Sequence, residues 1–264
     1  MEDRAQFPTP KVALLGRPPP AEGYVARPDG HRFRLWLLDG FHLEQDGRVL
    51  RTPHSASRLL ALVGVRGRIG RAEIAGTLWP EVPEAKAHGS LRTVLWRLRQ
   101  LAASALVVGR EILTLNPAME VDVRTFVAVA RRVLNGGDGG LNGWQVPTLA
   151  VMGELLPGWY EDWVLFERER LRQLHLHALE AMAEQLTRVQ RYSEAIEAAL
   201  AAVRLEPLRE SATRALIAAH LAENNVAEAV RRFESFRDGL TTELGVQPTA
   251  DLARLVEAGL RRGS

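Results

Sequence analysis

Apolar residues recur at every second position near the start of the chain, between residues 33 and 50. This period of two is typical of a strand with one buried face. Two dipeptides, Asp39-Gly40 and Asp46-Gly47, favour tight turns that reverse the chain between strands. The sequence therefore predicts a small antiparallel sheet, whose inward-facing residues are Phe33, Leu35, Leu37, Phe41 and Leu43.

The periodicity becomes that of a helix over residues 84–102. One stripe of this helix is apolar and consists of Leu91, Val94, Leu95, Leu98, Leu101 and Ala102. The opposite face has no carboxylate after Glu84 and contains Lys86, Gly89, Arg92, Thr93, Trp96, Arg97, Arg99 and Gln100. A face with charges of one sign favours a polyanionic partner. An arginine-rich surface helix without any partner has the same pattern.

Two shorter helices are predicted before the basic helix and a β-hairpin after it. The helices cover residues 56–65 and 71–78, and Pro80 stops the second. The hairpin covers residues 106–115, with Arg110 at its turn. A sheet, three helices and a hairpin form the α+β order of a winged helix-turn-helix. In that fold the third helix enters the major groove of DNA and the hairpin lies along the backbone.

The basic helix and its neighbours supply the candidate DNA contacts. We expect the centre of the polar face, Arg92, Thr93, Trp96 and Arg97, to meet the bases. We expect Lys86, Arg99, the hairpin residue Arg110 and the helix-start residue Arg71 to meet phosphates. Trp96 has two interpretations, because an indole among arginines can touch a base or sugar, or can pack under the hairpin or against a second domain.

Charge is divided unevenly along the chain, although the formal net charge is only +2. Residues 31–115 contain 13 Arg and Lys against 7 Asp and Glu, whereas residues 116–264 contain 17 against 21. A basic first half and an acidic second half indicate that only the first half meets double-stranded DNA.

Four segments resemble a known family of bacterial regulators. LWPE, residues 78–81, and LRTVLWRLRQL, residues 91–101, resemble an OmpR-like winged helix. ELLPGWYEDWV, residues 154–164, and ELGVQPTADLARLVEAGL, residues 243–260, resemble the bacterial transcriptional activator domain. Together the segments resemble the Streptomyces antibiotic regulatory protein (SARP) type. The resemblance implies an activator of a linked gene cluster that binds promoter direct repeats as a homodimer.

The second half also contains a helical repeat. Glu194-Ala195 and Glu228-Ala229 are 34 residues apart, which is the period of tetratricopeptide (TPR) repeats. The positions where such repeats place small or apolar residues are Leu179, Met182, Ala183, Leu186, Ala195, Ala199 and Ala202 in one unit, and Thr213, Leu216, Ile217, His220, Ala229, Phe233 and Phe236 in the next. We therefore divide the chain into a proline-rich leader (1–30), a winged helix (31–117) and an all-α TPR-like domain (118–264).

Little in the chain indicates catalysis or a cofactor. There is no cysteine, phosphate-binding loop or zinc-protease motif. His175 and His177 are two residues apart on a predicted helix, so they should face different sides and not share a metal. The paired carboxylates Glu161 and Asp162, like Asp122, are expected to cap helices, and the glycine-rich residues 135–143 are expected to form a loop.

These patterns predict a non-enzymatic transcription regulator without cofactor or metal. It has no apolar run long enough to cross a membrane and no secretory signal, so we expect it in the cytoplasm. Its helical half would serve self-association or RNA polymerase. The alternative is a TPR-like interaction scaffold whose winged helix contacts protein rather than DNA.

Overall fold

The structure is a computed structural model, which describes residues 32–136, 149 and 152–262. Its strands are β1 (Phe33–Trp36), β2 (His42–Gln45), β3 (Arg48–Leu50), β4 (Ile69–Gly70), β5 (Leu106–Val108), β6 (Ile112–Leu115) and β7 (Glu120–Val121). Its helices are α1 (His54–Arg66), α2 (Arg71–Leu78), α3 (Glu84–Leu101), α4 (Asp122–Leu134), α6 (Asp162–Arg188), α7 (Tyr192–Leu205), α8 (Glu210–Ala222), α9 (Val226–Leu244) and α10 (Ala250–Arg262). The predicted leader, residues 1–30, and residues 137–143 of the predicted loop lie outside the described residues.

The first sheet has the strand order β3-β2-β1-β7. β1 pairs antiparallel with β2, with Leu35 opposite Leu43, and β2 pairs antiparallel with β3. Asp46 and Gly47 connect β2 to β3 with φ values of 51° and 83°, and two successive positive φ values are what a two-residue type I′ hairpin requires. The predicted antiparallel sheet is confirmed, and β7, which runs parallel to β1, adds a strand that was not predicted.

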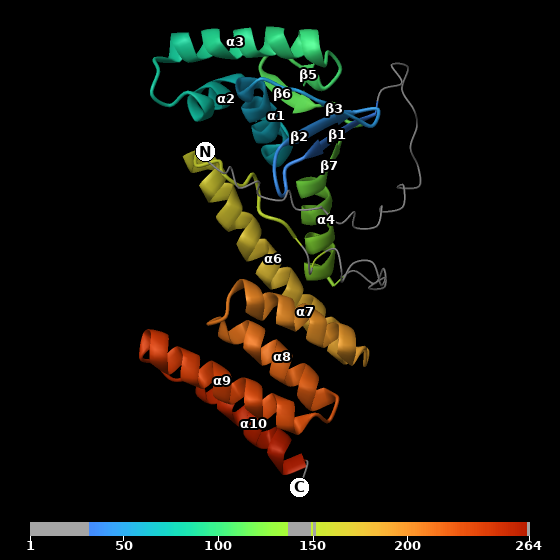
Figure 1. The fold of residues 1–264 in the computed structure, drawn as a ribbon, viewed down its shortest axis with the longest axis vertical. Helices are drawn as coiled ribbons and strands as arrows, with labels where there is room; N and C mark the ends of the chain where they lie inside the picture. Colours follow the sequence, from blue (N-terminus) through green and yellow to red (C-terminus); the bar gives the residue numbers. More distant parts are fainter. Residues whose placement is uncertain (1–31, 137–148, 150–151, 263–264) are drawn as a thin grey trace, which may run out of the picture. The chain divides into compact units, whose positions relative to one another are not determined.

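Helices α1, α2 and α3 pack against one another, and α3 lies beside β5 and β6 (Figure 1). The order of three helices and a hairpin is the one predicted. β6 pairs with β5 on one side and with the two-residue strand β4 on the other, so the hairpin belongs to a three-stranded sheet. We call β5, β6 and the turn between them the wing hairpin.

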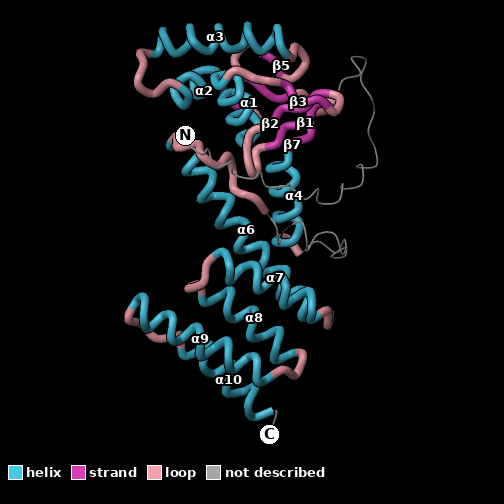
Figure 2. The backbone as a smooth tube through the Cα atoms, in the orientation of Figure 1, coloured by secondary structure: helices cyan, strands magenta, loops and turns pink. Residues whose placement is uncertain are grey.

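Helices α6 to α10 each pack on the next one along the chain (Figure 2). Of the residues at the predicted repeat positions, all are buried except Phe233, which is half-buried. The all-α character of the second half is therefore confirmed, and the 34-residue spacing places its small and apolar residues between stacked helices.

The sheet, the three helices and the first C-terminal helices share one hydrophobic core. This core runs from Phe33 in β1 to Ala219 in α8, and a smaller cluster lies among α8, α9 and α10. Strand β7 and helix α4, which both follow the predicted boundary at residues 117 and 118, pack against β1. The domain boundary between residues 117 and 118 stays a prediction. The described residues before and after this position pack together in one hydrophobic core.

Candidate nucleic-acid interface

Helix α3 presents a buried apolar stripe and an exposed basic face. Ala87, Leu91, Val94 and Leu98 are buried, while Leu95 is half-buried. Glu84 lies in the first turn and Arg99 in the last, where each charge interacts favourably with the helix dipole. Leu101 was predicted on the apolar stripe but is exposed, because α3 ends at this residue.

The predicted contact residues divide into an exposed set and one half-buried residue. The exposed residues are Lys86, Arg92, Thr93, Trp96, Arg97 and Arg99 on α3, and Arg110 in the wing turn. Arg71, the first residue of α2, is half-buried. The Thr93 hydroxyl donates to the Gly89 carbonyl at 3.1 Å within α3, so its methyl group and the acceptor side of its hydroxyl oxygen remain for a partner.

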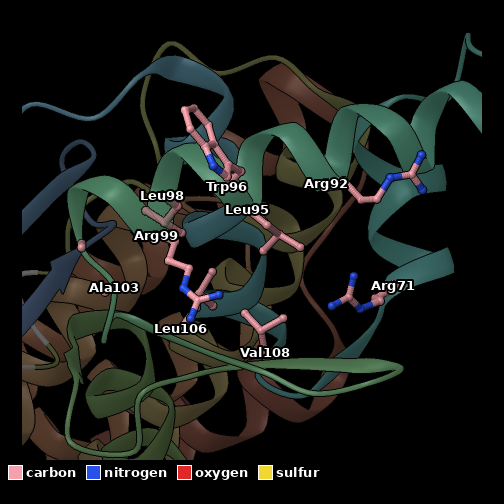
Figure 3. Close-up of a pocket in the computed structure, with 10 residues that line it drawn as sticks. Arg71, Arg92, Leu95, Trp96, Leu98, Arg99, Ala103, Leu106 and Val108 are labelled. Carbon is pink, nitrogen blue, oxygen red and sulfur yellow. The ribbon is translucent and has the colours of Figure 1, made fainter.

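A groove of about 510 Å³ lies between α3 and β5 (Figure 3). It is lined by Arg71, Arg92, Leu95, Trp96, Leu98, Arg99, Ala102, Ala103, Leu106 and Val108. The structure thus brings together four predicted contact residues from α2 and α3. Lys86, Thr93, Arg97 and Arg110 do not line the groove.

Arg71 connects the start of α2 to the wing hairpin. Its guanidinium donates to the Gly109 carbonyl at 3.2 Å, and its backbone N–H donates to the Glu111 carbonyl at 2.8 Å. Its Nε is buried and has no acceptor among the described residues. Arg71 therefore holds the wing turn against α2, a role that the sequence did not indicate.

Trp96 is 63% exposed. In Figure 3 its indole points away from β5, whereas Arg99 extends toward that strand. The indole is therefore not packed under the wing hairpin, which was one part of the second interpretation, and it is exposed to a partner.

The cations of α3 and the wing turn differ from most cations of the C-terminal helices. Among the residues that the structure describes, Lys86, Arg92, Arg97, Arg99 and Arg110 form no ion pair or hydrogen bond through their side chains. Between residues 162 and 261, every arginine except Arg188 and Arg204 is paired with a carboxylate. One such carboxylate is Glu169, whose pKa is lowered to about 2 by its hydrogen bond from Arg172. Helix α3 and the wing turn therefore present five cations that no carboxylate of the described residues neutralises.

Asp122 connects α4 to the end of β1. Its carboxylate accepts the backbone N–H groups of Leu37 at 2.9 Å and Leu38 at 2.8 Å. Burial raises the pKa of this carboxyl group, against the opposing effect of the N–H donors. The prediction that Asp122 caps α4 is wrong in position, because Val121 occupies the N-cap, although the Asp122 carboxylate also accepts the Val123 N–H in the first turn at 2.7 Å.

Arg124 connects α4 to the end of α1. Its guanidinium donates to the Gly64 carbonyl at 2.8 Å and to the Val63 carbonyl at 2.9 Å. The last carbonyls of a helix lack partners within that helix, so the bond to Gly64 satisfies a group that would otherwise need water, whereas the Val63 carbonyl also accepts the backbone N–H of Gly67 at 2.9 Å. Burial lowers the pKa of this guanidinium.

Residues 154–159, within the ELLPGWYEDWV segment, pair with the chain after β1. Leu156 N–H donates to the Leu37 carbonyl, and Asp39 N–H donates to the Glu154 carbonyl, both at 2.8 Å. The Trp159 ring stacks on Phe41 with a centroid separation of 6.1 Å. The family resemblance of this segment does not indicate its physical role, which is to join the N-terminal sheet to α6.

Two ion pairs add to this junction. Glu161, expected to cap α6, instead pairs with Arg58 of α1 at 2.8 Å, and no side chain caps α6. Glu167, a buried carboxylate of α6, lies 3.4 Å from Arg66 at the end of α1. Sequence reasoning missed these partners because they are about 100 residues apart and share no local pattern.

The two neighbouring histidines do face different sides of α6, as predicted. His175 is buried, contacts the Leu149 carbonyl through Nε2, and has its pKa lowered by burial, while His177 is exposed. The described residues contain no group of three side chains placed to hold a metal ion. Among them there is also no helix with the length and apolar character needed to cross a membrane.

Comparison with known proteins connects this arrangement to transcription regulators. A family model for the bacterial transcriptional activator domain matches residues 128–260. Regulatory protein AfsR of Streptomyces griseus is 28% identical over 225 residues, which are 80% of this chain and 22% of that protein. The chain therefore spans about a fifth of the length of this curated relative.

A solved structure extends the similarity in fold to most of the chain. Mycobacterium tuberculosis EmbR, in complex with a low-affinity phosphopeptide, superposes with a TM-score of 0.68 at 20% identity. The match covers 89% of this chain and 66% of EmbR. The fold class predicted from the sequence, a winged helix followed by helices, is confirmed. The prediction of a non-enzymatic protein is also confirmed, because the matches are to transcription regulators.

Proposed function

Because the chain belongs to the bacterial transcriptional activator domain family, as a member of the SARP type, we propose that it is a sequence-specific DNA-binding activator. One observation carries the proposal: the cations of α3 and the wing turn have no ion-pair partners among the described residues, whereas most arginines of α6 to α10 are paired. Unpaired arginines on an exposed helix are available to phosphates and to base edges.

The exposed residues of α3 are given separate roles. Arg92 and Arg97 read guanine through bidentate hydrogen bonds, and the methyl group of Thr93 contacts a thymine methyl. Lys86, Arg99 and Arg110 contact phosphates and position the helix. Arg71 contributes to a phosphate contact and holds the wing turn through the Gly109 carbonyl. The exposed indole of Trp96 contacts a base or sugar.

The helical half acts on partners other than DNA. We assign to α6–α10 the recruitment of RNA polymerase and the self-association of two copies on promoter direct repeats. The stacking of these helices supports a role in binding protein, since stacked helical pairs expose extended surfaces. The protein acts in the cytoplasm on a linked gene cluster.

The decisive experiment compares the full chain on its own upstream DNA and on random duplex, at two salt concentrations. We expect tighter binding to the upstream DNA, and we expect the preference to persist at the higher salt.

Arg97→Ala should cost about 1–3 kcal/mol of binding free energy on the upstream site and relax the sequence preference of the protein. Arg188→Ala, which removes another exposed and unpaired arginine from α6, is the matched control and should leave both unchanged. Equal affinity for all duplexes, with tight binding to a helical peptide, would support the scaffold alternative instead.

A further inference from the structure

Arg71 and Arg99 stand on opposite sides of the groove between α3 and β5, with Leu95 and Val108 between them (Figure 3). The groove volume of about 510 Å³ lies within the range of sites that bind small molecules. Such sites combine an apolar lining with a few polar groups that fix the orientation of the ligand. This groove has both parts.

The polar part of the lining is entirely cationic. No carboxylate lines the groove, and its charged residues are Arg71, Arg92 and Arg99. The last two have no ion-pair partner among the described residues, and the buried Nε of Arg71 has no acceptor there. A guanidinium is a planar fork that matches a carboxylate and also stacks on flat rings. The groove is therefore complementary to an anion and repels a cation.

The apolar part of the lining decides which kind of anion fits. Val108 is 50% exposed and Leu95 is half-buried, and together they form the apolar floor of the groove, while Leu98 and Leu106 are buried beneath it. A small hydrated ion such as sulfate would leave this floor in contact with water, whereas a flat ring system covers it. We propose that the groove binds a small planar aromatic carboxylate, with the ring on the floor and the carboxylate on the guanidinium groups.

A bound carboxylate occupies the face that α3 and the wing hairpin turn toward DNA, so ligand and DNA exclude each other. This consequence rests on the proposed function. It makes the groove a site where an aromatic acid releases the protein from its promoter. For simple competition, ligand at ten times its Kd raises the apparent Kd for DNA about 11-fold.

The binding step is tested on the full chain by calorimetric titration with 2-naphthoate, and with its neutral methyl ester as the ligand control. We expect saturable 1:1 binding of the acid and none of the ester. Arg99→Gln should weaken 2-naphthoate binding about tenfold or more, since it removes a charge-assisted hydrogen bond. Arg97→Gln, which changes an exposed arginine of α3 outside the groove lining, should leave 2-naphthoate affinity unchanged.

The competition step repeats the DNA titration in the presence of 2-naphthoate. DNA binding with no saturable 2-naphthoate binding, or equal affinity of wild type and Arg99→Gln for the acid, overturns this inference and leaves the proposed function intact. Binding of 2-naphthoate without binding of any DNA overturns the proposed function and leaves the groove assignment standing. Simultaneous binding of acid and DNA overturns the mutual exclusion.

Discussion

Arg110→Ala tests whether the wing turn contacts the DNA backbone. Arg110 is exposed and has no side-chain partner among the described residues. Its truncation therefore leaves no group of the folded protein without a partner, and the stability of the protein should change by no more than about 0.5 kcal/mol. Any larger effect on DNA binding reports a contact made only in the complex.

The expected magnitude follows from the number of cations assigned to phosphates, which are Lys86, Arg71, Arg99 and Arg110. Each neutralised phosphate contributes about −0.9 to the slope of log K against log salt, so four give about −3.6. Raising salt fourfold then lowers affinity about 150-fold. Without Arg110 the slope becomes about −2.7, and the same change in salt costs about 40-fold.

The assay is fluorescence anisotropy with a labelled random duplex, so that base contacts contribute little to the slope. Arg204→Ala is the matched control, because Arg204 is also exposed and unpaired among the described residues but lies on α7. We expect its slope to equal that of the wild type. An unchanged slope in Arg110→Ala would refute the contact between the wing turn and a phosphate. The same reduction in both variants would refute it too, because net charge rather than the wing contact would then govern the slope.

Three further predictions concern the fold and the wing. Arg124→Ala should lower the free energy of unfolding by about 3 kcal/mol, since two charge-assisted hydrogen bonds of about 1.5 kcal/mol each are lost. The control is Arg131→Ala on the same helix, which is exposed and unpaired among the described residues and should change the free energy of unfolding by less than about 0.5 kcal/mol. Urea unfolding measures both, and equal effects of the two substitutions would contradict the role of Arg124. Gly109→Ala places a Cβ 2.8 Å from the Ile112 carbonyl oxygen, so it must shift the wing turn and should weaken binding to random duplex about fivefold, or about 1 kcal/mol, with the salt slope unchanged. Burial lowers the pKa of His220, so the unfolded state takes up a proton first as pH falls below about 6.5. His220 should then lower stability by up to about 1.4 kcal/mol per pH unit, in addition to the effect of His175, whose pKa burial also lowers. His220→Leu should remove the His220 part of this decline in urea titrations.

Local patterns predicted the elements well because periodicity depends only on neighbouring residues. The alternation after Phe33, the helical stripe containing Leu91 and Val94, and the hairpin around Arg110 all appear in the structure as expected. Short strands such as β4 and β7 were missed. Each has two residues, which is too short for a period of two to be visible, and each exists only because a partner strand lies beside it.

The predicted roles of single carboxylates failed for a related reason. Asp122 and Glu161 both stand at the start of helices, where the local rule expects capping. In the structure Asp122 accepts N–H groups of residues 37 and 38, and Glu161 pairs with Arg58. These partners come close only when the N-terminal sheet and α1 pack against α4 and α6, so no local pattern could reveal them.

The sequence by itself determined the basic face of α3 and its place in a winged helix, because charge and periodicity are properties of the chain. The contrast in pairing is largely a property of the chain too, since carboxylates three or four residues away reach many arginines of α6 to α10, whereas α3 has no carboxylate after Glu84. Only the tertiary structure decided the long-range pairs, such as Arg58 with Glu161 and Arg209 with Glu180, because these partners meet only after packing. The groove is likewise a tertiary feature, since its walls come from α2, α3 and β5 and meet only after packing.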